Sequence, residues 1–277
     1  MGASDWLELR QDAQTRIETM HAHFEGHAYD PHWHDTYVIG VTRQGVQQFN
    51  CRRNRVNSTP GHVFLLEPGE IHDGNAPEAE GFTYYTLYID PAWLDGAMAR
   101  LFEETPGGFE MGFTNTLSDD PALALATMGA FNALHHHEMR IVREASLDRL
   151  LTSLTAHLSW RKTQADVQLP AAAWRARDYL HAHYMEDIGL DELAQIAGTD
   201  RFRLTRAFKS AFGVAPHAYL IQLRLARART RLAKGDTPAE VAAVLGFADQ
   251  SHFGRWFQRA YRLTPAAYRK ICTRLPG

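Results

Sequence analysis

The sequence predicts an α+β protein of two domains, a β-rich N-terminal domain with added helices and an all-α C-terminal domain. Residues 23–90 are rich in β-branched and aromatic residues, and turn signals interrupt them. From residue 91 onward, apolar residues recur at steps of three and four, as in amphipathic helices. The charge also changes sign, because residues 1–170 hold 12 Lys+Arg against 23 Asp+Glu and residues 171–277 hold 17 against 9. Halves of opposite sign indicate two domains with different partners, and the basic half favours a polyanion.

Length and composition exclude several protein classes. With 277 residues, of which 45% are hydrophobic, the chain is long enough for two cores. No apolar run approaches the roughly eighteen residues that span a bilayer, and the first ten residues, MGASDWLELR, do not read as a secretory signal. Cys51 and Cys272 lie far apart without CxxC spacing, which argues against a disulfide framework. We expect a reduced, cytoplasmic protein with no membrane partner.

The β-rich segment reads as short strands separated by turns. Turn signals occur at Asp30-Pro31 and Gln44-Gly45, and a buried strand at 63–66 is followed by a turn at Pro68-Gly69. The stretch GFTYYTLYI (residues 81–89) alternates as a half-buried strand does. Short strands at this spacing favour a small antiparallel barrel or jelly roll.

Two helices are predicted after the strands. Asp119-Asp120-Pro121 is a helix start, and the triplet at residues 135–137, His-His-His, falls at the expected helix end. A longer amphipathic helix is expected over residues 138–160. Its leucines recur at helical steps and either pack on the barrel or pair with a second chain, which makes a homodimer our expectation: Leu147, Leu150, Leu151, Leu154 and Leu158. The expected domains are 1–160 and 174–277, joined by a polar linker at 161–173.

The C-terminal half repeats one phrase. Residues 198–208 read GTDRFRLTRAF and residues 246–257 read GFADQSHFGRWF. Leu193 precedes Val241 by 48 residues, and Phe208 precedes Phe257 by 49. Each copy is a short predicted helix, a turn that begins at glycine, and a second helix with polar residues, which is the helix-turn-helix pattern. The predicted helices are 174–184, 190–197, 200–212, 216–235, 239–246, 249–261 and 265–272.

The second helix of each copy carries side chains that suit a DNA major groove. Arginine pairs bidentately with guanine and glutamine with adenine, while threonine and small residues contact thymine methyl groups. The candidates that the pattern exposes are Arg201, Arg203, Thr205, Arg206, Gln250, Ser251, Gly254 and Arg255. A second set either reaches phosphates or is ordinary surface charge: Lys209, Arg224, Arg227, Arg229, Arg259 and Arg262. The alternative is a helical interaction module whose arginines are merely solvated.

Residues 189–269 resemble the DNA-binding domain of AraC/XylS-type bacterial transcription regulators, above all in VAAVLGFADQSHFGRWFQRAYRLTPAAYR. The resemblance implies two subdomains bridged by a long helix, here residues 216–234, with both recognition helices in successive major-groove segments. By position, it implies that the base-reading residues are Phe202, Thr205, Arg206, Gln250, Ser251, Gly254 and Arg255. Gly254 departs from the longer side chain often found there, so a base contact at that position does not follow.

The N-terminal histidines resemble part of another pattern. HWHDTYVIGVTRQG (32–45) and GHVFLLEPGEIH (61–72) are similar to the cupin-like sensor domain often attached to this DNA-binding module. Metal-dependent cupins have a glutamate near the position of Val38 and Ile39, where this sequence has none. His32, His34 and His72 either form an open zinc, iron or nickel site, contact an organic ligand, or form hydrogen bonds within the barrel. Because the carboxylate is missing, we expect no metal and no cofactor, and an effector site made of His32, His34, Tyr37, His72 and Tyr84.

These expectations combine into a sequence-specific transcription regulator. Its expected partners are double-stranded promoter DNA, a small-molecule effector, RNA polymerase and a second copy of the chain. The resemblance favours an activator, with repression as the alternative. The rival interpretation is a metal-dependent cupin enzyme with a helical appendage. The sequence has no Gly-x-Ser-x-Gly motif, phosphate loop or dinucleotide fingerprint, and we expect no enzymatic activity.

Overall fold

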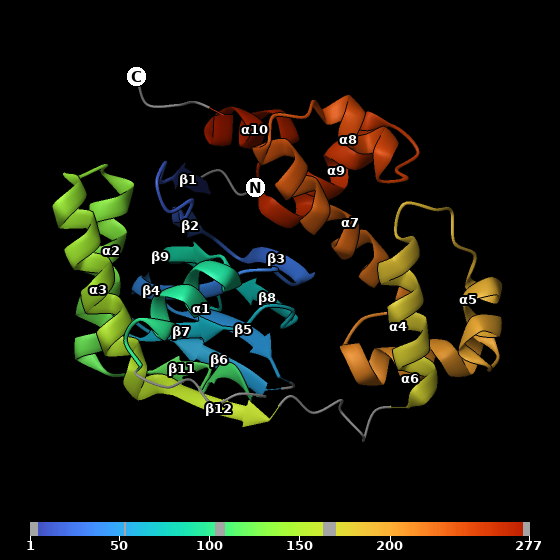
Figure 1. The fold of residues 1–277 in the computed structure, drawn as a ribbon, viewed down its shortest axis with the longest axis horizontal. Helices are drawn as coiled ribbons and strands as arrows, with labels where there is room; N and C mark the ends of the chain where they lie inside the picture. Colours follow the sequence, from blue (N-terminus) through green and yellow to red (C-terminus); the bar gives the residue numbers. More distant parts are fainter. Residues whose placement is uncertain (1–4, 53, 103–108, 163–169, 274–277) are drawn as a thin grey trace. The chain divides into compact units, whose positions relative to one another are not determined.

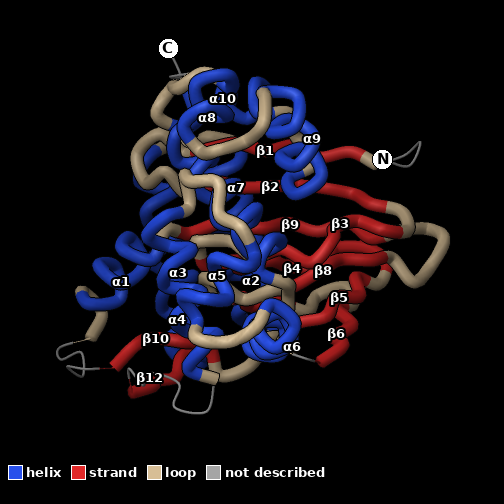
Figure 2. Tube along the Cα trace, turned by 90° about the vertical axis from the view of Figure 1, so that its right-hand side faces the viewer, coloured by secondary structure: helices blue, strands red, loops and turns tan. Residues whose placement is uncertain are grey.

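The computed structural model describes residues 5–52, 54–102, 109–162 and 170–273. The chain divides near residue 163 into two compact units (Figure 1). Among the described residues, strands occur in the N-terminal unit, and the regular structure of the C-terminal unit is helical (Figure 2). The predicted α+β fold class is therefore confirmed. None of the helices in these described ranges is long and apolar enough to span a bilayer.

Two antiparallel sheets form the body of the N-terminal unit. The first contains β1 (Trp6–Gln11), β2 (Glu18–Phe24), β9 (Phe82–Ile89), β4 (Tyr37–Gly45), β7 (Val63–Leu66) and β11 (Leu117–Ser118), in this spatial order. The second contains β3 (His27–His32), β8 (His72–Asn75), β5 (Gln47–Cys51) and β6 (Asn54–Ser58), in this spatial order. A separate pair is made by β10 (Phe109–Phe113) and β12 (Leu158–Lys162).

The first sheet is buried on both faces, so the unit has two apolar layers. One layer lies between the two sheets and includes Phe24, Val38 and Phe82. The other lies between the first sheet and α1 (Pro91–Ala99), α2 (Pro121–His135) and α3 (Arg140–Leu154), which cover that face in Figure 1. Because strand residues alternate between faces, Val38 and Ile39 belong to different layers.

The helix expected over residues 138–160 is shorter than predicted. Helix α3 ends at Leu154, a single 3-10 turn follows, and Leu158 begins β12 opposite Phe113. The apolar spacing continues to Leu158, but backbone pairing with β10 takes the chain into a strand. The leucines of α3 pack inside their own unit: Leu147, Leu150, Leu151 and Leu154 are at most 4% exposed. This face is therefore not open for pairing with a second chain.

Two strand predictions also differ from the structure. β1 and most of β2 precede residue 23, where the strands were expected to begin. Asp30-Pro31 is not a turn but lies inside β3, an edge strand in which a proline does not interrupt a central ladder. The pairing of β3 with β8 is irregular between Tyr29 and His32. The turn predicted at Pro68-Gly69 is present between β7 and β8, whereas Gln44 and Gly45 are the last residues of β4, where Gly45 has a left-handed φ and one residue separates β4 from β5.

The C-terminal unit consists of seven helices within its described residues. They are α4 (Ala171–His183), α5 (Leu190–Ala197), α6 (Arg201–Phe212), α7 (Pro216–Ala233), α8 (Pro238–Val244), α9 (Gln250–Tyr261) and α10 (Pro265–Thr273). Helices α5 and α6 form the first helix-turn-helix, and α8 and α9 form the second. β12 ends at Lys162 and α4 begins at Ala171, so most of the predicted linker, residues 163–169, lies outside the described residues.

The repeated phrase has a local physical reason. Gly198 and Gly246 adopt left-handed φ values of 71° and 69°, which favour glycine and end the first helix of each copy. A Cβ at Gly246 would also lie 2.7 Å from the carbonyl oxygen of Met185. The side chains of Asp200 and Asp249 then accept backbone N–H groups at the start of α6 and α9. The glycine and the aspartate occur in both copies because each copy ends one helix and begins another within a few residues.

Helix α7 joins the two helix-turn-helix copies. It packs against α4 and α6 on one side and against α8, α9 and α10 on the other. Arg224 and Arg229 of α7 are 7% and 8% exposed, so they are not the phosphate contacts or surface charges considered from sequence. Arg224 donates to three backbone carbonyls, and the guanidinium of Arg229 lies over the rings of Tyr261 and Tyr268.

Candidate functional site

Helix α6 presents one polar stripe to solvent. Leu204 and Phe208 are fully buried and fix the rotation of the helix. The residues at steps of one and four around the exposed side are Arg201, Phe202, Thr205, Arg206 and Lys209. All are exposed except Thr205, which is half-buried, and Phe202 is 66% exposed. The Arg201 guanidinium lies over the Phe202 ring, 4.9 Å from its centroid, so one face of this exposed ring is covered by an arginine.

Helix α9 presents the same stripe with different side chains. Phe253 and Phe257 are fully buried, and the outward positions are Gln250, Ser251, Gly254 and Arg255. Their spacing matches that of Arg201, Phe202, Thr205 and Arg206 on α6. A Cβ at Gly254 would meet no atom within 4 Å, so this position is open to a close backbone approach. Two helices with one spacing and two sets of side chains suit two different stretches of bases.

Three of the sequence candidates on α6 already have intramolecular partners, and for Arg201 these are the Asp191 carboxylate, 3.8 Å away, and the Phe202 ring. Arg203 lies off the stripe, and its guanidinium is 3.3 Å from the carboxylate of Asp200. The Arg203 backbone N–H, together with that of Phe202, lowers the pKa of this carboxyl group. The hydroxyl of Thr205 donates to the carbonyl of Arg201 at 2.8 Å, so its hydrogen is used within the helix and the oxygen remains an acceptor.

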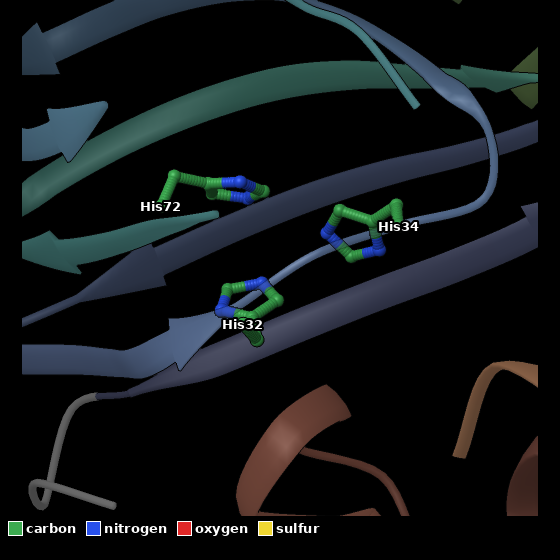
Figure 3. A group of neighbouring side chains, drawn as sticks. All are labelled: His32, His34 and His72. Atoms are coloured by element: carbon green, nitrogen blue, oxygen red, sulfur yellow. The ribbon is translucent and has the colours of Figure 1, made fainter. Parts of the chain in front are cut away.

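The N-terminal unit brings three histidines together. His32 ends β3, His34 follows two residues later, and His72 begins β8 directly opposite His32. Their side chains are buried, with 4%, 6% and 9% exposure. The ring centroids of His32 and His72 are 4.4 Å apart, and a potential ligand nitrogen from each of the three rings lies within 4.8 Å of the other two. Figure 3 shows the three rings gathered around a common space.

Backbone carbonyls set the proton positions on two of these rings. Nδ1 of His32 is 2.8 Å from the carbonyl oxygen of Asp30, and Nδ1 of His72 is 2.9 Å from that of Glu70. A carbonyl oxygen only accepts, so Nδ1 carries the hydrogen in each ring. Burial lowers the pKa of His72, which favours its neutral form. In a neutral ring protonated at Nδ1, Nε2 keeps its lone pair for another partner.

Aromatic residues surround the histidines. The ring of Tyr29 lies 5.3 Å from that of His32, and the ring of Tyr88 lies 5.1 Å from that of His34. The Tyr84 hydroxyl is 2.9 Å from the Tyr29 hydroxyl, so Tyr84 is one residue removed from the cluster. The structure does not bring Tyr37 to it: this residue belongs to the layer under the helices, and its hydroxyl donates to the Met111 carbonyl.

Sequence reasoning missed Tyr29. Strict alternation along β3 places Tyr29 and His32 on opposite faces, because an odd number of steps separates them. The irregular pairing between these two residues brings their rings into contact. No signal in the sequence marks that irregularity, and Asp30-Pro31 instead suggests a turn.

The second group of histidines has a structural role. His135 is 1% exposed, its Nδ1 lies 2.9 Å from the hydroxyl of Thr19, and burial lowers its pKa to about 4. His136 and His137 are exposed at the end of α2, where the helix end was predicted. Only the first ring of the triplet therefore points into the protein core.

Comparisons with known proteins agree with both units. Residues 15–152 match the AraC-like ligand binding domain, and residues 193–271 match a helix-turn-helix domain. The uncharacterized HTH-type transcriptional regulator YbfI of Bacillus subtilis is 26% identical over 253 residues, covering 88% of this chain and 90% of YbfI. The HTH-type transcriptional activator RhaS of Yersinia pestis is 31% identical over 105 residues, 38% of each chain.

A solved structure shares the fold over nearly the whole chain. Unsaturated fatty acid bound ToxT from Vibrio cholerae has a TM-score of 0.55 at 13% identity, covering 98% of this chain and 97% of that one. The paired stripes on α6 and α9 are thus part of a recognised DNA-binding domain, and the barrel that holds the histidines is part of a ligand-binding domain. The chain belongs to the AraC-type family of transcription regulators, with an AraC-like ligand-binding domain followed by a helix-turn-helix DNA-binding domain.

Proposed function

We propose that this regulator activates transcription in the cytoplasm when a small-molecule effector binds in its N-terminal barrel. Differential affinity of the effector for two arrangements of the chain shifts their populations and so changes promoter occupancy or contact with RNA polymerase. The observation that carries the proposal is the equal spacing of outward side chains on α6 and α9. The relative RhaS is named as an activator, which supports the sign of regulation.

The DNA contacts divide into two kinds. Arg206 and Arg255 suit guanine, Gln250 suits adenine, and Ser251 suits either a base edge or a phosphate. Phe202 suits apolar contact with a thymine methyl group, and Arg201 and Lys209 at the ends of the α6 stripe suit phosphates. Arg203, paired with Asp200 and off the stripe, is the weakest of the candidates.

The effector site is assigned to the histidine cluster and its neighbours. His32, His34 and His72 form one buried polar group in the N-terminal unit, and the hydroxyl of Tyr84 contacts that of Tyr29 beside it. Neutral imidazole offers one donor or one acceptor at its outward nitrogen, which suits a polar or anionic ligand. A fatty acid carries such a carboxylate, and the ToxT structure holds an unsaturated fatty acid, which supports a ligand of this size in the fold.

A homodimer is part of the proposal, through a surface other than the leucines of α3. Met139 and Ile141, at the turn from α2 into α3, are 71% and 72% exposed. Large apolar side chains that stay this exposed at one hairpin tip favour a protein contact, and a second copy supplies the matching apolar surface.

The enzyme alternative has weaker support. YbfI, to which the chain is similar along most of its length, is named as a transcriptional regulator. The proposed ligand is therefore bound and released unchanged. Incubating the protein with its effector and recovering a chemically altered product would instead favour the cupin-enzyme interpretation.

The DNA-binding part is tested by selecting genomic fragments with purified full-length protein and measuring their affinity by gel shift. Binding is expected to weaken on the order of tenfold or more between 50 and 200 mM salt, because phosphate contacts release counterions. Arg206→Ala and Gln250→Ala are each expected to cost about 1–3 kcal/mol on the selected site and to relax its preference at one base pair.

The matched control is Lys270→Ala, an exposed cation on α10 away from both stripes, which should leave base preference unchanged. Equal losses for Arg206→Ala on the selected site and on random DNA would show that α6 does not read bases. Affinity that stays flat across the salt range would contradict DNA binding by the basic unit.

A further inference from the structure

We propose that His32, His34 and His72 bind one divalent transition-metal ion through one ring nitrogen each and leave a coordination position open for an anionic effector. The proposal deepens the effector site assigned above and rests on that assignment for its regulatory meaning. Metal binding itself rests on the arrangement of the three side chains.

The nitrogen positions are close to those a metal needs. When three atoms lie within 4.8 Å of one another, some point lies no farther than about 2.8 Å from all three, against about 2.0–2.1 Å for a zinc–nitrogen bond. Small rotations of the rings close this difference. Two of the rings are on directly opposed residues of paired strands, His32 on β3 and His72 on β8, so the sheet itself holds them together.

Two rings are already in the form that binds a metal. Metal-binding histidines usually donate their second ring N–H to a carbonyl or carboxylate, which fixes the tautomer and the ring orientation. Nδ1 of His32 makes this bond to the Asp30 carbonyl and Nδ1 of His72 makes it to the Glu70 carbonyl. Both accepting carbonyls lie two residues before the ring they hold, Asp30 within β3 and Glu70 in the loop before β8, so the adjacent backbone orients each histidine.

The donor set selects the class of metal. Three imidazole nitrogens suit zinc, copper, nickel or iron, while magnesium and calcium require oxygen ligands. Cys51 lies opposite His72 in the β5–β8 pairing, but its thiol is not among the ligand atoms that lie within 4.8 Å of one another, and that group within the described residues contains only the three histidines.

The missing glutamate affects both the charge and the coordination number of a bound ion. Three neutral ligands leave the charge of a divalent ion uncompensated, and three nitrogens leave a tetrahedral ion one position short. Both effects favour an incoming anion with an oxygen donor, such as a carboxylate. At the level of sequence the missing glutamate argues against a metal, whereas a three-histidine set binds zinc without one and makes the ligand supply the negative charge.

The test is a calorimetric titration of chelator-treated full-length protein with Zn²⁺, accompanied by visible absorption with Co²⁺ as a spectroscopic probe. We expect one ion per chain and a cobalt spectrum typical of low coordination number. His34→Ala and His72→Gln should each weaken Zn²⁺ binding by at least about tenfold, because losing even an outer partner of a metal ligand costs that much. His27→Ala is the control, because His27 lies on β3 but outside the cluster.

Acetate serves as the carboxylate probe and should change the cobalt spectrum of the wild-type protein. No stoichiometric binding of either metal would overturn the proposal, as would a folded His72→Gln protein that binds Zn²⁺ as tightly as wild type. A cobalt spectrum unaffected by acetate would overturn the open position. Gel shifts on the same samples separate the two proposals. Protein that binds DNA but no metal contradicts only the metal site. Protein that binds metal but no DNA contradicts the proposed regulatory function.

Discussion

Arg224 is expected to stabilise the DNA-binding unit rather than to contact DNA. Its guanidinium donates three hydrogen bonds of 2.7 Å, to the backbone carbonyls of Tyr184, Glu186 and Gly246. The first two carbonyls lie between α4 and α5, and the third lies in the turn between α8 and α9. The side chain therefore connects the loop before the first helix-turn-helix to the turn of the second.

The three hydrogen bonds set the expected loss in the free energy of unfolding when Arg224 is replaced by alanine. The three bonds are partly buried, and an unsatisfied buried acceptor costs about 1–3 kcal/mol, so their gross loss is at most about 3–9 kcal/mol. Rehydration of some carbonyls and the recovered desolvation of the guanidinium reduce this loss, and we expect Arg224→Ala to lower the free energy of unfolding by about 3–5 kcal/mol. A domain is typically stable by only about 5–15 kcal/mol, so the loss is readily measured.

Urea unfolding followed by the helical circular dichroism signal measures the loss, and gel shifts at several salt concentrations measure the charge contribution. Arg227→Ala is the matched control, because Arg227 lies one turn away on α7 and is exposed. Arg224→Ala should lower the urea midpoint and leave the salt slope unchanged. An unchanged midpoint with a salt slope smaller by about one would show that Arg224 contacts a phosphate instead.

Two further predictions concern the packing of each unit. Asp200→Ala and Asp249→Ala should each lower the free energy of unfolding by about 0.5–2 kcal/mol, because each carboxylate caps a recognition helix; urea unfolding that loses nothing in either variant would contradict the role given to the repeated aspartate. Leu150→Ala should cost about 2–5 kcal/mol and leave the sedimentation behaviour of the folded protein unchanged, whereas Ile141→Asp should leave stability nearly intact and shift dimers to monomers. If the Leu150→Ala protein is folded but sediments as a monomer, the dimer contact lies on the leucine face of α3 instead.

The sequence was most informative where local chemistry decides the structure. Gly198 and Gly246 end helices and Asp200 and Asp249 begin them, and both roles depend on a few neighbouring residues. The family and its fold could therefore be predicted from the repeated phrase and the surrounding pattern.

Features that depend on long-range pairing could not be predicted in this way. Leu158 continues a helical period but pairs with Phe113, which lies 45 residues earlier in the chain. Tyr37 is next to Val38 in β4 and therefore faces the other apolar layer. Whether Tyr37 faces the effector site depends on the register of β4, which the sequence alone does not reveal. Arginine is usually a surface residue, and Arg224 is buried because its guanidinium donates to three backbone carbonyls that are distant in sequence.

Helix α7 also sets a distance. Its 18 residues correspond to an axis of about 27 Å at the usual rise of 1.5 Å per residue, and both helix-turn-helix copies pack directly on it. Because α7 is one continuous helix between the two helix-turn-helix copies, it fixes the distance between α6 and α9. From the proposed base contacts of α6 and α9, we expect the promoter to present two short base sequences at one fixed separation and on one face of the duplex. Each inserted base pair moves the second sequence by about 3.4 Å along the axis and turns it away from its helix. We therefore expect the spacing between the two DNA elements to affect binding as strongly as their base sequences do.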